Sequence, residues 1–388
     1  MAKRPQNCLA VKTPSNEPHN LALWKEERLF YDSDTFFTAL CQDFDNASES
    51  ILLETYIFQH DELGKRIVKH LIAAAKRDVE VKIIVDGFGS PLWKYFFQAQ
   101  MEKAGIECKV FHRIPLDLFL FFPMLLPGFR KLSAKLDRRN HRKLYVIDNK
   151  IAFLGSMNIV SYHLKEFRGK HAWRDTGVRV TGSAVVTLSE AFKHSWESPH
   201  FLKKNLNFVT PLVRTYNSRR RQKFLYKDFL SKLENAQEKI WLTTAYFVPP
   251  GSFLKKLRIA AKKNVNICIL TTAKTDVFLI RWVRTAFYFG LLKSGAKIFE
   301  YQPTVLHAKC AIIDDFVMLG STNLNNRSFF HNLEIDVVLK SKESLQSLEN
   351  QFQIDLSNSH EILAKDWKKR FWLDRFLGKI AILFKYWL

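Results

Sequence analysis

The pattern of hydrophobic and polar positions predicts alternating strands and helices in two separate parts of the chain. In the first part, β-branched and aromatic residues predict a strand at residues 51–58, and helical spacing follows at 64–76 before a strand at 81–86. A helical pattern that begins at residue 34 precedes this unit. The second part repeats the order, with helix, strand, helix and strand at residues 229–237, 240–247, 253–263 and 265–270. Strands joined by helices indicate parallel-rich sheets that are covered by helices.

A second pattern also occurs twice, and it combines an apolar strand with polar residues at fixed positions. Residues 144–147 and 310–313 are almost wholly apolar, as in a strand buried in a sheet core. A His-x-Lys pair precedes each run, and an Asp, a tight turn, a second apolar run and Gly-Ser-x-Asn follow it. The repeated polar residues are His141, Lys143, Asp148, Ser156 and Asn158 in the first copy and His307, Lys309, Asp314, Ser321 and Asn323 in the second.

These repeats indicate a duplicated chain. Tyr56 and Tyr246 lie 190 positions apart but the two motif histidines lie 166 apart, so the first half carries about 24 extra residues before its motif. The predicted parts are a mobile arm at 1–20, a first half at 21–205 with an insertion at 115–139, a second half at 206–360 and a tail at 361–388. The basic run at 219–221 is assigned to the linker and the start of the second repeat.

The repeated residues suit chemistry at a phosphodiester. One imidazole can attack phosphorus while a second, protonated imidazole gives its proton to the departing alcohol. Lys143 and Lys309 would hold the non-bridging oxygens, and Asn158 and Asn323 would add neutral donors beside Ser156 and Ser321. Asp148 and Asp314 belong to the candidate catalytic motifs, but their place at turns favours a role in bracing the local loop or the lysine. Core packing is favoured for Glu54, Tyr56 and Tyr246.

The spacing His-x-Lys-x4-Asp followed by Gly-Ser-x-Asn, present twice, resembles the phospholipase D superfamily. From about residue 29 onwards the chain is similar to bacterial cardiolipin synthases of that superfamily, in their shorter form without N-terminal transmembrane helices. Supporting stretches are Leu53-Glu-Thr-Tyr-Ile-Phe58, Tyr246-Phe-Val-Pro249, Leu306-His-Ala-Lys309 and Gly320-Ser-Thr-Asn-Leu-Asn-Asn-Arg-Ser328. The resemblance implies a duplicated α/β fold, with mixed sheets in two βαβ-rich halves that pack by pseudo-twofold symmetry around one shared site.

The resemblance also implies roles for individual residues. His141 would be the nucleophile that forms a phosphohistidine, and His307 the general acid and base, an order that the residues alone leave open. A carboxylate after each motif would orient a histidine, and Glu334 fits this pattern. Asp175 is the counterpart in the first half, where it departs from Glu. The family uses no metal and no cofactor is expected. The implied reaction moves a phosphatidyl group onto phosphatidylglycerol to form cardiolipin.

Composition narrows the class of partner. A formal net charge of +22 over 388 residues favours a polyanion, either an anionic membrane surface or nucleic acid. The N-terminus lacks the apolar stretch of a signal peptide, and the apolar run at 118–126 is shorter than the roughly 20 residues that span a bilayer. The five cysteines show no paired spacing, which favours reduced thiols and neither a disulfide framework nor a zinc site.

Two segments favour lipid over nucleic acid. The tail at 361–388 combines Trp367, Trp372 and Trp387 with spaced cations, as in an interfacial helix, with docking on the protein's own core as the alternative. The insertion at 115–139 would dip into a leaflet or form a buried hairpin. We therefore expect anionic phospholipids, phosphatidylglycerol among them, as partners, and a peripheral site on the cytoplasmic side of the bacterial inner membrane. A hydrolytic phospholipase D, a nuclease and a non-enzymatic membrane adaptor remain alternatives, and the oligomeric state is left open.

Overall fold

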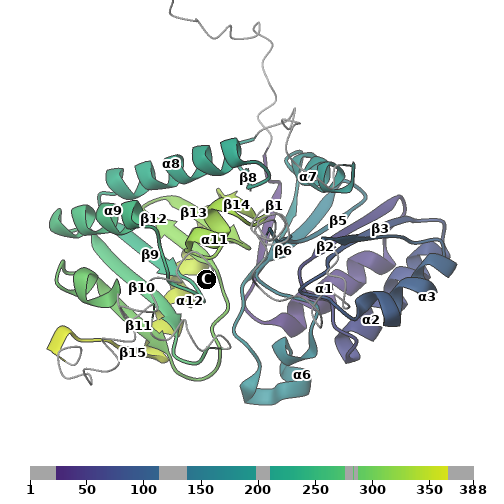
Figure 1. Cartoon of the computed structure of the whole chain (residues 1–388), viewed down its shortest axis with the longest axis horizontal. Helices are drawn as coiled ribbons and strands as arrows, with labels where there is room; N and C mark the ends of the chain where they lie inside the picture. Colours follow the sequence, from purple (N-terminus) through teal and green to yellow (C-terminus); the bar gives the residue numbers. More distant parts are fainter. Residues whose placement is uncertain (1–22, 113–137, 198–209, 276–282, 284–286, 366–388) are drawn as a thin grey trace, which may run out of the picture.

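The protein consists of two mixed β-sheets, each carrying helices on its outer face. The structure is a computed structural model and describes residues 23–112, 138–197, 210–275, 283 and 287–365. In Figure 1 the N-terminal half, in purple and blue, lies beside the C-terminal half, in green and yellow.

The first sheet has seven strands in the order β1-β7-β6-β5-β2-β3-β4. Strands β2, β3 and β4 run parallel, whereas β5, β6 and β7 pair antiparallel, and β5 joins the two groups by pairing with β2. The strands are β1 (Glu26–Phe30), β2 (Ser50–Thr55), β3 (Glu80–Asp86), β4 (Glu107–Phe111), β5 (Lys143–Ile147), β6 (Ile151–Gly155) and β7 (Gly177–Thr181).

The second sheet repeats this order as β8-β14-β13-β12-β9-β10-β11 and adds β15 beside β11. Its strands are β8 (Val213–Thr215), β9 (Lys239–Thr243), β10 (Asn266–Thr272), β11 (Lys297–Tyr301), β12 (Cys310–Ile313), β13 (Phe316–Gly320), β14 (Ile335–Leu339) and β15 (Ser359–Glu361). The predicted duplication and the mixed α/β fold are confirmed, because each strand of the first sheet has a counterpart at the same place in the second.

Helices form the outer layers, as Figure 1 shows for α1, α2 and α3 on one side and α8 and α9 on the other. Their apolar faces pack on the sheets in two separate cores, one in each half. The helices are α1 (Ser33–Asp45), α2 (Glu62–Ala75), η1 (Lys94–Gln98), α3 (Ala99–Lys103), α6 (Lys165–Arg168), α7 (Val185–Glu197), α8 (Arg219–Asn235), α9 (Gly251–Lys262), α11 (Asn326–Phe330) and α12 (Lys342–Ser357).

A third core joins the two halves. It combines Leu144, Val146 and Leu154 of β5 and β6 with Ile312 and Leu319 of β12 and β13. Strands β5 and β12 have apolar side chains on both faces, because one face packs in the core of its own half and the other packs in the third core, to which α7 and both sheets contribute. This explains why the motif strands lack the alternation of a half-exposed strand.

Four predicted segments need comment. The basic run at 219–221, assigned to the linker and the start of the second repeat, is the first turn of α8, where the Ser218 hydroxyl accepts a bond from the Arg221 amide. The arm at 1–20, most of the insertion at 115–139 and most of the tail at 361–388 fall outside the described residues. Within the described ranges, every helix is too short or too polar to traverse a bilayer.

Candidate active site

Each motif histidine lies immediately before the central strand of its sheet. His141 precedes β5, which lies between β2 and β6, and His307 precedes β12, which lies between β9 and β13. The turns after these strands are tight hairpins, with positive φ at Asp148, Asn149 and Asp314. The predicted succession of strand, turn and strand is confirmed in both copies.

The backbone crosses between the halves at both histidines. Asn140 forms a parallel bridge with Leu333, and Arg174 forms one with Leu306. The residue before each histidine is therefore paired with the residue before the carboxylate of the other half. Hydrogen bonds fix this contact, because the His141 amide donates to Leu333 O at 3.0 Å and the His307 amide donates to Arg174 O at 2.8 Å.

Two glycines permit the close approach of these segments. A Cβ at Gly155 would lie 2.4 Å from Thr176 O, and one at Gly320 would lie 2.3 Å from Ile335 O. Both distances are too short for a side chain, and Gly155 also has φ of +154°. Glycine at the end of β6 and of β13 thus places Gly-Ser-x-Asn against the residue that follows each carboxylate.

His141 is held by the carboxylate of the second half. Its Nδ1 lies 3.0 Å from Glu334 Oε2, and the same oxygen accepts a bond from the Ser321 hydroxyl at 2.6 Å. The other oxygen, Oε1, accepts from the Ser328 hydroxyl at 2.7 Å. Glu334 is fully buried. A neutral His141 that donates from Nδ1 leaves Nε2 unprotonated, which is the state that a nucleophile needs.

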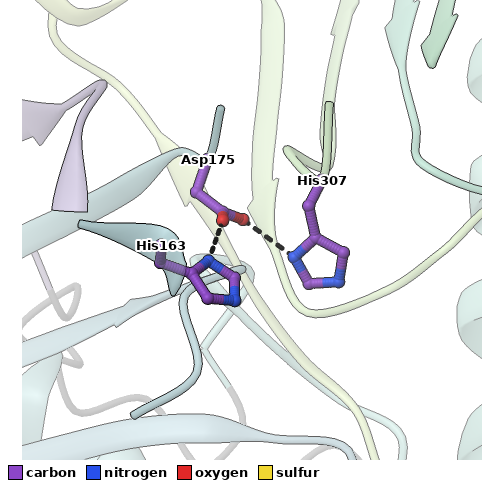
Figure 2. Close-up of side chains that lie close together, drawn as sticks. All are labelled: His163, Asp175 and His307. Carbon is purple, nitrogen blue, oxygen red and sulfur yellow. Dashed lines mark hydrogen bonds and ion pairs between the residues drawn. The ribbon is translucent and has the colours of Figure 1, made fainter. Parts of the chain in front are cut away.

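His307 is held by the carboxylate of the first half. Its Nδ1 lies 2.9 Å from Asp175 Oδ1, and the second oxygen, Oδ2, is bonded to Nδ1 of another histidine, His163. Figure 2 shows the two imidazoles on either side of the carboxylate. All three side chains are buried. Asp175 therefore serves two histidines, whereas Glu334 serves one histidine and two hydroxyls.

The two lysines lie beside the histidines of their own motifs. Lys143 Nζ donates to His141 O at 2.7 Å, and Lys309 Nζ donates to His307 O at 2.5 Å. Both lysines are buried. Asn158 and Asn323 are also buried, and neither side-chain oxygen has a hydrogen-bond partner among the described residues. The site thus contains two buried cations and two buried amides whose oxygens have no hydrogen-bond partner among the described residues.

Burial keeps the histidines neutral in the unliganded protein. Burial lowers the pKa of His141 to about 4 and that of His307 to about 3, although the Glu334 and Asp175 carboxylates oppose the shift. Burial, helped by the nearby charge of Lys309 from the other half, also lowers the pKa of Lys143 to about 7. Lys309 likewise lowers the pKa of His141. The charged groups of the two motifs therefore act on one another across the boundary between the halves.

Asp148 and Asp314 lie at the opposite ends of the motif strands from the histidines. Asp148 accepts bonds from the amides of Ser48, Glu49 and Ser50 at the start of β2, and Asp314 accepts from those of residues 237–239 at the start of β9. The predicted contact with a local loop is therefore present. Their inclusion in the catalytic set stays a prediction, which these contacts disfavour because the side chains are bonded to the loops and are separated from the histidines by the length of a strand.

The bracing role predicts a loss of stability without loss of catalysis. In D314N, the new amide group would face the Gln237 N–H, which now donates to Oδ2 at 2.9 Å. We expect the free energy of unfolding to fall by about 1–3 kcal/mol and kcat to stay within about threefold. Denaturant unfolding of D314N, with the neighbouring exposed residue in D315N as control, measures this. A large drop in kcat with unchanged stability would contradict the bracing role.

Comparison with known proteins identifies the family. The model of the cardiolipin synthase, phospholipase D-like domain matches residues 40–196 and 229–356. The chain belongs to this family. It is 30% identical to a cardiolipin synthase of Listeria monocytogenes over 359 residues, which cover 89% of this chain and 72% of the relative. A Clostridium perfringens cardiolipin synthase is 28% identical over 360 residues, covering 88% and 72%.

Solved structures support the fold. The phosphatidylserine synthase of Haemophilus influenzae superposes with a TM-score of 0.69 at 14% identity, over 95% of this chain and 97% of the other. A polyphosphate kinase from Porphyromonas gingivalis superposes with a TM-score of 0.59 at 13% identity, over 88% of this chain and 49% of the other. At these identities the likeness concerns the fold alone. The phospholipase D-like architecture predicted from the doubled motif is confirmed.

The supporting residues divide into two kinds. Ser321 bonds Glu334 directly, whereas Ser156 bonds only the backbone of Thr176, the residue after Asp175. The difference follows from side-chain length, since Asp is one methylene shorter than Glu.

His163, Asp175 and His307 are close enough together to hold a metal ion. Ligands of a tetrahedral zinc ion are about 3.3 Å apart, so the 2.9 Å contact between His307 and Asp175 fits a direct hydrogen bond better.

Several neighbours of the site were not predicted. His163 and Ser328 were missed, although each lies five residues after the Asn of its Gly-Ser-x-Asn. Glu54 is buried, but it bonds Asn140 and pairs with Arg142 on either side of His141, so apolar packing does not describe it. The Tyr56 ring lies 5.0 Å from the His141 ring and is partly exposed, so it borders the site and is not part of the core.

Proposed function

We propose that the chain is a phosphatidyltransferase of the cardiolipin synthase type. The observation that carries the proposal is the crossed pairing of His141 with Glu334 and of His307 with Asp175, each histidine next to a buried lysine. This arrangement supplies two oriented imidazoles and two cations at the boundary between the halves, and we propose that they share one substrate phosphate. It suits in-line attack on a phosphodiester, with one imidazole on each side of phosphorus.

In the first step, His141 Nε2 attacks the phosphorus of a phospholipid. The bond from phosphorus to the headgroup oxygen breaks as the new bond from nitrogen to phosphorus forms. The headgroup alcohol leaves with a proton from His307, and Lys143 and Lys309 neutralise the non-bridging oxygens in the transition state. The bound phosphodiester anion favours a protonated His307, because a nearby negative charge raises a histidine pKa.

In the second step, a hydroxyl of phosphatidylglycerol attacks the phosphohistidine. His307 takes the hydroxyl proton, the bond from phosphorus to nitrogen breaks and His141 is regenerated. The product is cardiolipin when donor and acceptor are both phosphatidylglycerol, and glycerol is then released. No metal or cofactor takes part in this scheme. Asn158 and Asn323 are proposed to donate to the phosphoryl oxygens.

The direct test is a product assay. Vesicles that contain labelled phosphatidylglycerol are incubated with the full-length protein, and cardiolipin, phosphatidic acid and glycerol are quantified, with nicked plasmid DNA scored in parallel. Cardiolipin and glycerol in equal amounts support transfer. Phosphatidic acid as the main product would indicate a hydrolytic phospholipase D, and nicked DNA without lipid products would indicate a nuclease.

We propose an anionic membrane surface as the partner that presents the substrate. Four large apolar side chains are exposed within ten residues of the segment after β3: Phe88, Leu92, Tyr95 and Phe96. Exposed apolar clusters of this kind are typical of interaction surfaces. A cleft of about 530 Å³ beside them is bordered by Lys65 and Lys69 of α2 and by Lys76, which caps its C-terminus, and these cations can attract lipid phosphates.

This exposed segment is connected to the site. The Ser90 hydroxyl donates to Tyr56 O at 3.0 Å, and the Tyr56 ring lies against His141. The Asp86 carboxylate accepts from the amides of Phe88 and Gly89 with one oxygen and from the Asn140 amide with the other. The start of this segment is therefore tied to the residues around the catalytic histidine.

Removing the apolar cluster should weaken membrane binding. We expect Y95S/F96S to lower sedimentation with phosphatidylglycerol vesicles by about tenfold, since two exposed aromatic side chains are lost. V186S, at an exposed apolar position on α7, is the matched control and should bind as the wild type does. Equal binding by both variants and the wild type would exclude this face.

The proposed location is peripheral, on the cytoplasmic side of the bacterial inner membrane. The exposed cluster and the strongly positive net charge support it. The aromatic, basic tail is proposed to add to membrane binding. Nucleic acid is not the proposed partner.

A further inference from the structure

The two carboxylates of the site differ in the side chain that holds their second oxygen. Asp175 uses His163 and Glu334 uses Ser328, and both residues lie five positions after the Asn of their Gly-Ser-x-Asn. Position for position, the duplicated halves thus place an imidazole in one centre and a hydroxyl in the other. The symmetry of the fold is broken at this point and not at the histidines or lysines of the motifs.

His163 is bound in a way that simple packing does not require. The side chain belongs to η2 (Ser161–His163), is 1% exposed, and packs against the rings of Tyr162 and Trp173, which also contact each other. Its Nδ1 faces Asp175, and its Nε2 is buried without a hydrogen-bond partner among the described residues. An orphaned buried nitrogen costs roughly 1–3 kcal/mol, which an apolar side chain at this place would not incur.

The charges around His307 define what His163 can do. Asp175 is the carboxylate that contacts His307, and Lys309 and His163 are the other titratable neighbours that act on it, while Lys143 of the other motif acts on Asp175. A carboxylate that accepts a second N–H offers less of its charge to the first ring. The Asp175 carboxylate favours protonation of His307. His163 and Lys309 oppose this effect.

We propose that His163 is a positioning residue that, by donating from Nδ1 to the second oxygen of Asp175, fixes this carboxylate on His307 and reduces the negative charge that the carboxylate presents to the His307 ring. This inference rests on the proposed function, in which His307 exchanges protons with the leaving and entering alcohols. His307 takes up its proton from solvent when the phosphodiester anion binds, and the fixed carboxylate keeps Nε2 directed at the reacting oxygen.

Two amide variants separate the effect of the Nδ1–H donor of His163 from the effect of the volume of its ring. Asparagine places its amide nitrogen close to the position of the imidazole Nδ1, whereas glutamine places it closer to that of Nε2. H163N should keep the bond to Asp175 and retain kcat within about threefold. H163Q should lower kcat about tenfold or more without changing KM, and should raise the pKa of His307 by about one unit. H163L is a second variant without a donor and should behave as H163Q does.

The titration is followed by NMR of ¹⁵N-labelled imidazoles in the full-length protein with inorganic phosphate bound, and H307N assigns the signal. This readout needs no lipid reaction, so it tests His163 even where the proposed transfer activity fails. H360L, at an exposed histidine on β15, is the control and should leave the titration unchanged. An unchanged His307 titration in H163Q and H163L, or equal behaviour of H163N and H163Q, would overturn the proposal.

Discussion

Replacing either motif histidine with asparagine should lower kcat by roughly 10⁴-fold, and the double variant H141N/H307N should lose little more than either single variant. The reason is that both imidazoles act on one phosphorus atom in the same step. Removing either one therefore stops that step, and removing the second has little further effect. Two independent sites would instead lose about half of the activity for each substitution. Non-additivity therefore tests the shared site as well as the identity of its residues.

The measurement is cardiolipin formation from phosphatidylglycerol vesicles, with H360N as the matched histidine control. Circular dichroism and vesicle sedimentation confirm that each variant is folded and bound to lipid. Retention of more than a few per cent of the activity in H141N or H307N would exclude the proposed roles. Losses that multiply in the double variant would indicate that the two histidines work separately.

The second large effect is expected at Glu334, which lies in the second half but contacts the histidine of the first. When His141 attacks phosphorus, its ring becomes positively charged, and the buried Glu334 carboxylate compensates that charge. E334Q preserves the shape and removes the charge. We expect kcat to fall by roughly 10²–10⁴-fold, as when a catalytic histidine loses its carboxylate partner.

Single-turnover measurement of phosphoenzyme formation locates the defect. E334Q should slow the formation of the intermediate on His141, whereas E343Q, at an exposed glutamate on α12, should react at the wild-type rate. The crossed contacts assign Glu334 to His141 and Asp175 to His307. A defect in E334Q that spares the first step and affects only the transfer to the acceptor would contradict this assignment.

Much of this architecture could be predicted because it depends on local patterns. The apolar runs at 144–147 and 310–313, each between a His-x-Lys pair and an Asp, predicted buried strands and hairpins, and both are present. The repetition predicted the pseudo-symmetric halves. Glu334 and Asp175 were recognised as orienting carboxylates, although the sequence did not indicate which histidine each one holds.

The pairing of each motif histidine with the carboxylate of the other half depends on contacts between segments that are distant in the sequence. Asn140 and Leu333 are brought together by the packing of two sheets, and spacing along one copy of the motif carries no information about it. His163 was missed for a similar reason, since its partner Asp175 is shared with His307 of the other half. The repeat also gave no sign of His163, because a serine, at 328, occupies the equivalent position in the second half.

The measurement that tests the central claim most directly is the trapping of the covalent intermediate. The full-length wild-type protein and H307N are mixed with phosphate-labelled phosphatidylglycerol vesicles, quenched at alkaline pH and digested for mass spectrometry. We predict a labelled phosphatidyl group on His141 that forms in both proteins, slowly in H307N, and is lost during a chase with excess unlabelled phosphatidylglycerol only in the wild type. Cardiolipin formed at the wild-type rate with no label on either His141 or His307 would contradict the account.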